Sequence, residues 1–208
     1  MATVDGYGFV RPLGVGKTTI TAYIDNNPSC KAKCQVKVTG TLNNATIRLS
    51  KETYTYTGKA LKPDVTVIVN GLTLTEGKDY TLRYDKNKNA GTAKVIVTGK
   101  DYYSGKKSKN FTIKKATQKF SVTAKAQTVK NVKKSKLTGI FTVKNNHGKV
   151  TYSKASGSGI FTVDKSGAIK VKKGTKKGTY KIKVKCKAAG DGNYKAAEKT
   201  VTAKITVK

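Results

Sequence analysis

The sequence predicts an all-β chain built from small antiparallel sandwich or barrel modules. Three observations lead there: apolar residues alternate with polar ones in short runs, turn-forming residues separate the runs closely, and no run leaves room for a helix. Only 37% of the 208 residues are hydrophobic. Alternation lets each strand bury one face and expose the other, so we expect folded sheets rather than disorder.

The stretch from Glu52 to Ile113 shows the pattern most clearly. The two-residue period occurs in Val65, Val67 and Val69, in Tyr80, Leu82 and Tyr84, and in Ala93, Val95 and Val97. Turn formers lie between these runs at Gly58, Pro63, Asn70, Gly71, Gly77, Asn89, Gly91, Gly99 and Gly105. Strand, turn and strand in this succession predict one complete antiparallel module.

The order of tyrosines, glycines and one Asp-Tyr pair in this stretch resembles the immunoglobulin-like repeat modules of large surface proteins from Gram-positive gut bacteria. The resemblance is carried by Tyr54, Tyr56, Gly58, Pro63, Leu74, Gly77, Asp79, Tyr80, Tyr84, Asn87, Asn89, Gly91, Ala93, Gly99, Tyr102 and Gly105. It implies tandem Ig-like β-sandwich modules and a surface location. It brings no catalytic motif.

Residues 1–40 resemble the second half of a group-2 bacterial Ig-like domain of the invasin/intimin kind. The matching passage is Gly-Phe-Val-Arg-Pro-Leu-Gly-Val-Gly-Lys-Thr-Thr-Ile-Thr-Ala, which leads into Val-Lys-Val. The resemblance implies that this first module is incomplete. Phe9, Ile20 and Ala22 would then stay uncovered unless the next module shields them, and this end should be the least protected part of the chain.

The remaining modules are predicted at 41–115 and 116–208. Strands in the last module are expected at 119–124, 140–143, 149–153, 160–163, 168–172, 179–186 and 200–207, about the number that an Ig-like sandwich needs. Lys149-Val-Thr-Tyr and Gly-Asp-Gly-Asn-Tyr resemble an Ig/cadherin-like module type.

An internal repeat supports this division. Gly99-Lys-Asp-Tyr102 precedes Phe111-Thr-Ile much as Gly192-Asn-Tyr194 precedes Ile205-Thr-Val, and such repetition suggests a rod. No signal peptide, membrane span or sorting sequence is recognisable, so we interpret the sequence as a fragment of a longer chain.

The charge balance makes nucleic acid the first partner to consider. Lys and Arg number 43 against 11 Asp and Glu, a net charge of +32. The lysines at 181, 183, 185 and 187 alternate with Ile182, Val184 and Cys186, which is typical of the solvated face of a strand. Arginine, the better residue for phosphate and base contacts, occurs only at Arg11, Arg48 and Arg83. The charge therefore predicts a diffuse field that attracts polyanions in a salt-dependent way.

Three cysteines leave at least one thiol unpaired within a chain. Cys34 and Cys186 share parity with neighbouring Val and Ile residues, so we expect both to be small buried hydrophobes. Cys30 and Cys34 are too far apart for a disulfide if their segment is extended. A single histidine cannot complete a zinc site with these thiols.

Two short motifs imitate ligand-binding loops. Gly14-Val-Gly-Lys-Thr18 lacks the leading glycine of a phosphate-binding loop, since Arg11 stands there, and a β-branched strand pattern follows instead of a helix. Asp85-Lys-Asn-Lys-Asn89 lacks the glycine and the glutamate of a calcium loop, for which Ala90 and Ile96 stand. We expect a turn before a strand at the first and a hairpin turn at the second.

The sequence offers little for catalysis. His147, the only histidine, lies in the turn-like Asn-Asn-His-Gly, where we expect a surface loop residue. Glu52, Glu76 and Glu198 are far apart in the sequence and form no local carboxylate pair. We predict no enzyme, and no catalytic, cofactor-binding or metal-binding residues.

Sugar binding is a further alternative, because β-sandwiches often carry sugars on exposed aromatic rings. Trp is absent, and Tyr54, Tyr56, Tyr80, Tyr84, Tyr152 and Tyr180 have the parity of core positions. Tyr102, Tyr103 and Tyr194 lie near turns. Lys–Asn isopeptide bonds occur in some related modules, but no carboxylate can be assigned to form one here.

The sequence favours a non-catalytic structural or adhesive stalk of an extracellular bacterial surface protein, with neighbouring Ig-like modules as its partners. The resemblance implies teichoic acid as the nearest polyanion. Binding of wall polymer or host glycan is one alternative, and non-specific binding of nucleic acid is a less favoured one.

Overall fold

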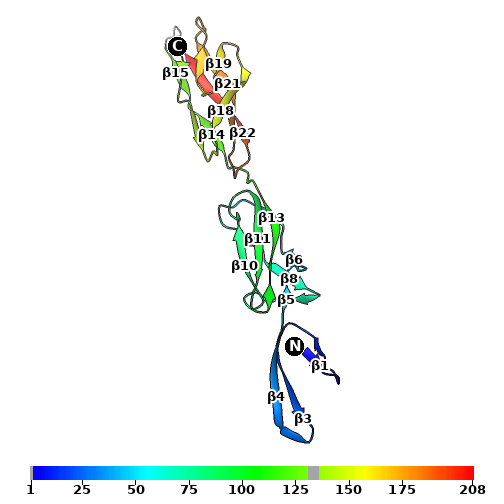
Figure 1. Cartoon of the computed structure of the whole chain (residues 1–208). Helices are drawn as coiled ribbons and strands as arrows, with labels where there is room; N and C mark the ends of the chain where they lie inside the picture. The colour runs from blue at the N-terminus through cyan, green and yellow to red at the C-terminus, as the bar shows by residue number, and fades with distance from the viewer. Residues whose placement is uncertain (1, 131–135) are drawn as a thin grey trace. The chain divides into compact units, whose positions relative to one another are not determined.

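The computed structural model describes residues 2–130 and 136–208, which form strands and turns and no helix (Figure 1). The predicted all-β class, with packed β-sandwich sheets, is confirmed. The chain divides into two compact units: unit 1 comprises Met1–Tyr54 and Gly58–Ile113, and unit 2 comprises Thr55–Thr57 and Lys114–Lys208.

Unit 1 contains two hairpins followed by a small sandwich. Its strands are β1 (Ala2–Val4), β2 (Val10–Pro12), β3 (Gly16–Ile24), β4 (Asn27–Val38), β5 (Gly40–Thr41), β6 (Thr46–Leu49), β7 (Thr53–Thr55), β8 (Val65–Val69), β9 (Leu72–Thr73), β10 (Tyr80–Asp85), β11 (Gly91–Gly99), β12 (Tyr103–Ser104) and β13 (Lys106–Lys114).

The sandwich packs the sheet β6-β8-β9 against the sheet β10-β11-β13-β7. Strand alternation places Val67, Val95 and Val97 inside with no exposed surface. Tyr80, Tyr103 and Leu42 complete this core. The three alternating runs predicted in this stretch are therefore strands, as expected.

The hairpin β3–β4 is a two-stranded sheet with one mainly apolar face, which no other described sheet covers. Its cross-strand pairs Thr18–Val36, Ile20–Cys34 and Ala22–Ala32 share one face, and Lys17–Lys37, Thr21–Lys33 and Tyr23–Lys31 share the other. Phe9, on the segment between β1 and β2, is 68% exposed and Ala22 is exposed, as the sequence predicts, whereas Ile20 is half-buried.

The expected burial of Cys34 is wrong, because its thiol lies on this uncovered face and is exposed. Parity placed Cys34 on the apolar face of β4 correctly. Parity does not reveal whether a second sheet covers that face. The prediction holds for Cys186, which is fully buried in unit 2.

Unit 2 is a larger sandwich. Its strands are β14 (Ser121–Ala124), β15 (Gln127–Val129), β16 (Lys136–Leu137), β17 (Phe141–Lys144), β18 (Val150–Gly157), β19 (Phe161–Val163), β20 (Ile169–Val171), β21 (Gly178–Ala188) and β22 (Ala197–Val207). The seven expected strands all occur within a few residues of their predicted bounds. Two short strands, β15 and β16, were not predicted.

The main sheet of unit 2 has the order β15-β22-β21-β18, and β16-β20-β19 and β14-β17 form the remaining sheets. The core gathers inward residues of these strands, among them Phe161, Ile169, Ile182 and Ile205. β21 and β22 pair antiparallel along their whole length, from Gly178–Val207 to Ala188–Ala197.

Parallel pairing occurs at corresponding places in the two units. In unit 1, β5 pairs parallel with β12, and in unit 2, Ala116 forms a parallel bridge with Tyr194. In unit 2, β15 also pairs parallel with the last strand, β22, with Gln127 opposite Ile205 and Val129 opposite Val207. The segment that leads into each sandwich is therefore held beside a later segment of the same unit.

Candidate functional site

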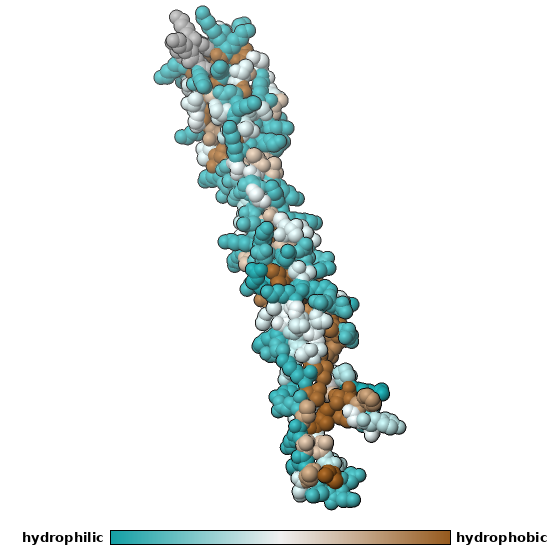
Figure 2. Space-filling view, viewed as in Figure 1, coloured by the Kyte–Doolittle hydropathy of each residue, from teal (hydrophilic) through white to brown (hydrophobic). Residues whose placement is uncertain are grey.

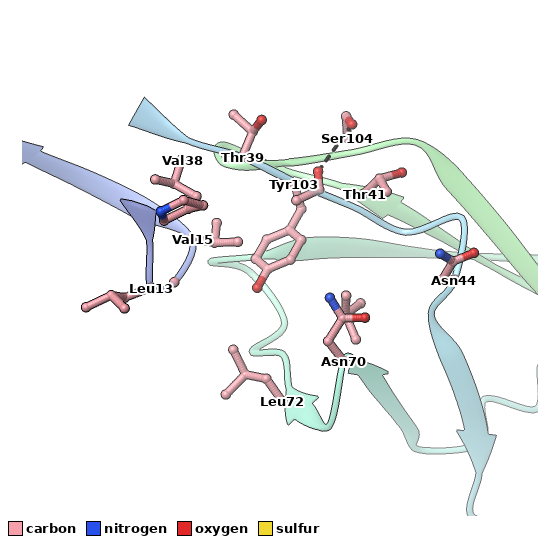
Figure 3. A pocket seen from close by; sticks show the side chains of 14 residues that line it. Leu13, Val15, Val38, Thr39, Thr41, Asn44, Asn70, Leu72, Tyr103 and Ser104 are labelled. Atoms are coloured by element: carbon pink, nitrogen blue, oxygen red, sulfur yellow. Dashed lines mark hydrogen bonds between the residues drawn. The ribbon is translucent and has the colours of Figure 1, made fainter. Parts of the chain in front are cut away.

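Unit 1 contains a cleft of about 620 Å³ where the hairpin β3–β4 meets the sandwich. Its walls come from Leu13, Val15, Val38 and Leu72, and polar groups are added by Asn44 and Asn70. Figure 3 shows the ring of Tyr103 in the middle, with its hydroxyl directed toward the space between Leu13 and Leu72. Hydrophobic residues gather in this part of unit 1, as Figure 2 shows.

Tyr103 is a core residue that the sequence placed only near a turn. Its side chain is 7% exposed and packs close to Gly40, where an added Cβ would lie 2.7 Å from the ring. Burial, and the negative charge of Asp79, raise the pKa of the Tyr103 phenol. The phenol therefore stays protonated at neutral pH and offers the cleft a hydrogen-bond donor, not a base.

The only histidine is part of a turn cluster in unit 2. His147 Nδ1 lies 3.2 Å from an Asp191 carboxylate oxygen, and its ring stacks on Tyr194 with centroids 3.5 Å apart. Tyr194 also meets Tyr56 edge to face at 5.4 Å. His147 lies in a turn as predicted, but its side chain is half-buried and packed rather than a free surface residue.

The side-chain carboxylate of Asp191 holds this cluster by accepting hydrogen bonds from backbone N–H groups. Its carboxylate accepts hydrogen bonds of 2.8 Å from the backbone N–H groups of Asn193 and Tyr194. These bonds, the first in particular, lower the pKa of Asp191 below its ordinary value. The buried Gln118 ties the neighbouring segments together, donating to Lys195 O and accepting from His147 N.

Several other acidic side chains also support the fold. Asp164 accepts from Ser166 and Ala168 in a turn, and Asp79 accepts from Thr75 N. Glu52 pairs with Lys109 at 3.0 Å, and Glu198 pairs with Lys185 at 3.4 Å. These groups hold turns and strand surfaces, and a catalytic carboxylate pair would need to project into a shared cleft instead.

The imitation motifs have the structures expected of them. Gly14 and Val15 lie in a bend, and Lys17 belongs to β3 opposite Lys37, so no helix opens there to hold a phosphate. The segment 86–90 joins β10 to β11, and Asn87 binds Leu61 through its side chain and its backbone. Among residues 2–130 and 136–208, no group of three His, Cys, Asp or Glu side chains is placed to hold a metal ion.

Most tyrosines pack within their unit. Tyr54 meets Phe111, Tyr180 meets Phe161, and Tyr152 stacks on Phe141 at 5.1 Å. The well-exposed rings are Tyr7, at 90%, and Tyr23, at 62%. Both lie on the hairpins of unit 1, and the sequence reasoning did not single them out.

Lysines cover the outer face of the main sheet in unit 2. Lys181, Lys183, Lys185 and Lys187 are exposed along β21, and the residues between them are fully buried. Figure 2 shows a largely hydrophilic surface over unit 2 on the face it draws. The predicted alternation of a wet and a dry side of this strand is therefore correct.

Comparison with known proteins gives structural likenesses only. No family model matches the chain, and no curated protein matches it. A protocadherin gammaB7 EC3-6 cis-dimer structure is similar over 100% of this chain and 63% of its own, with 12% identity and a TM-score of 0.38. Drosophila N-cadherin EC1-3 is similar over 100% of this chain and 86% of its own, with 13% identity and a TM-score of 0.31.

Human protocadherin-24 EC1-2 is similar over 78% of this chain and 97% of its own, with 10% identity and a TM-score of 0.32. Likenesses this weak do not carry a function from one protein to another. In the described part of the chain, no helix is long and apolar enough to cross a membrane.

Proposed function

We propose that this chain is a non-catalytic structural module of an extracellular bacterial surface protein, which spaces or displays other domains and carries tension between them. Within this proposal the chain is divided as 1–40, 41–115 and 116–208, with the first part an incomplete Ig-like module. Neighbouring modules of the same kind are its partners.

The observation that carries the proposal is the parallel pairing in both units. Tension pulls the N-terminal end of one strand and the C-terminal end of the other in opposite directions. In a parallel pair such as β15–β22 this force slides the strands along each other, so all the hydrogen bonds between them are loaded together. β5–β12 gives unit 1 a short pair of the same kind.

The use of the reactive side chains supports the non-catalytic part of the proposal. His147 and Asp191 hold a turn, and Asp164 holds another. The phenol of Tyr103 belongs to a buried side chain that lines the cleft, and its raised pKa makes it a weak acid. None of these three arrangements joins a nucleophile to a base.

A display experiment tests the spacer role. The chain is placed between a cell-wall anchor and an epitope-bearing domain, and antibody access to the epitope is measured on intact cells. An unrelated tandem pair of β-sandwiches of equal length should preserve access, and a Gly/Ser linker of the same number of residues should reduce it. Equal access with the flexible linker would contradict a role for the folded modules.

A further inference from the structure

One of the two inner strands of the main sheet in unit 2, β21, carries a row of lysines. Lys181, Lys183, Lys185 and Lys187 occupy alternate positions of β21 and are exposed, so their side chains leave the sheet on the same face. Alternate residues on a strand lie about 6.6–6.8 Å apart. The row therefore places lysine backbone positions at a regular spacing along the strand.

Hydroxyl groups border this row on both sides. On β22, Thr202 lies opposite Lys183 and Thr200 lies opposite Lys185. On β18, Ser156 lies opposite Lys183 and Ser153 lies opposite Lys185. Hydroxyls donate hydrogen bonds to phosphate oxygens, as lysines do, and they add no apolar surface.

The positive charge is not neutralised evenly along the row. Glu198 pairs with Lys185 at 3.4 Å and with Lys187 at 3.8 Å. At the other end, Lys181 lies directly opposite Lys204 on β22. Within the described part of the chain, Lys181, Lys183 and Lys204 form no ion pair. Like charges placed opposite each other destabilise a sheet, so a bound anion would relieve a cost that the free protein bears.

We propose that this face, consisting of Lys181, Lys183, Lys185, Lys187 and Lys204 with the bordering hydroxyls, binds a linear phosphodiester polymer along β21. The polymer lies lengthwise on the row, with its phosphates against successive ammonium groups. Attraction comes from charge and counterion release, so affinity falls steeply with salt.

The chemistry of the face favours a polymer without bases. Bases bind single-strand sites by stacking on aromatic rings, and the outward residues in register with the row are Lys, Thr, Ser and Glu. Tyr152 and Tyr180, on the same strands, pack inward. A lipid bilayer would gain from apolar side chains that insert into it, and this set of residues has none.

The first test compares two triple variants of the whole chain. K181Q/K183Q/K204Q removes three charges from the proposed face, and K170Q/K172Q/K173Q removes three exposed charges at β20 and just after it. Binding to synthetic poly(glycerol phosphate) is measured across a salt series. The first variant should lose about tenfold or more in affinity at low salt, with a salt slope smaller by about 2, and the second should lose much less.

The second test uses a variant that is expected to bind the polymer more tightly. E198Q frees Lys185 and Lys187, and E52Q removes a carboxylate that pairs with Lys109 in unit 1, so the net charge changes equally. E198Q should raise affinity for poly(glycerol phosphate), and E52Q should leave it nearly unchanged. Thermal unfolding of each variant serves as the control that it is folded.

Other outcomes would overturn the proposal. Equal losses in the two triple variants would mean that binding reflects a diffuse field and not this face. Tighter binding of poly(dT) than of poly(glycerol phosphate) would assign the face to nucleic acid. Equal binding of anionic vesicles would indicate a membrane surface.

Discussion

Two turns in different units use a glycine in the same way. An added Cβ on Gly99 would lie 2.5 Å from Tyr103 O, and one on Gly190 would lie 2.5 Å from Tyr194 O. Each glycine stands four residues before its tyrosine, and each tyrosine then joins a parallel pairing. The two turns correspond, but through other residues than the sequence predicts: Tyr103 takes the place of Tyr102, and Gly190 takes the place of Gly192.

Gly40 also leaves no room for a side chain beside Tyr103. Alanine there would place its Cβ 2.7–2.8 Å from two ring carbons of the buried Tyr103. G40A should therefore lower the free energy of unfolding by about 1–3 kcal/mol, since a well-packed ring has little room to move. Chemical denaturation of G40A and of the parent chain measures this difference in the free energy of unfolding.

Gly14 provides the matched control, because nothing lies within 4 Å of a Cβ added there. G14A should change stability by much less than G40A. A G40A chain as stable as G14A would show that Tyr103 is not held against Gly40.

At the level of elements, strand alternation decides most of the fold. Val95 and Val97 in β11, and Ile182 and Val184 in β21, are buried at the positions that a two-residue period assigns to the core. The period is a local property of a strand, so it can be predicted from sequence. The short strands β15 and β16 lack enough residues to show a period, and they are strands because longer neighbours pair with them.

The lysine face of β21 and the His147 cluster were less predictable, because they depend on pairing between segments that are distant in the sequence. The lysine row on β21 follows from alternation, but its neighbours Thr200, Thr202 and Lys204 are set by pairing with a strand elsewhere in the sequence. The contact of His147 with Asp191 and Tyr194 joins two distant turns. Register and long-range contacts of this kind have no signal within one segment.

The exposure of the hairpin β3–β4 leads to a prediction about how fast each of the three thiols reacts. Cys30 and Cys34 are exposed, and Cys186 is buried in unit 2, where burial raises its pKa to about 11. Two thiols should react with a disulfide reagent at pH 8 within the mixing time, and the third should react roughly 10²–10³-fold more slowly or more, because little of it is thiolate. Absorbance of the released thiolate gives the count.

Unfolding in denaturant should release the third thiol at the rate of the others, which controls for intact cysteine. Fast reaction of only one thiol in the native chain would contradict an uncovered β4. It would show that the apolar face of the hairpin is covered in solution.

At the level of the whole molecule, the charged residues and the core residues occupy different places and have different roles. The sequence has 43 basic and 11 acidic residues, and in the described part of the chain lysines such as those of β21 lie on outer faces, outside the two cores. A net charge of this size favours attraction to polyanions, as the proposed phosphodiester-binding face requires. In the proposed structural role, the strand pairing determines how the chain responds to force.

The measurement that tests the structural role most directly is the force needed to unfold unit 2 in two pulling directions. Handles are attached to the whole chain through cysteines at K114C and K208C, or at K177C and K208C, with Cys30 and Cys34 replaced by serine. The second pair of handles opens β21 from β22 at the end where Gly178 lies opposite Val207, so hydrogen bonds break one after another. The first pair slides β15 along β22. A higher unfolding force for the first pair is the predicted result, and equal forces would contradict a module built to carry tension.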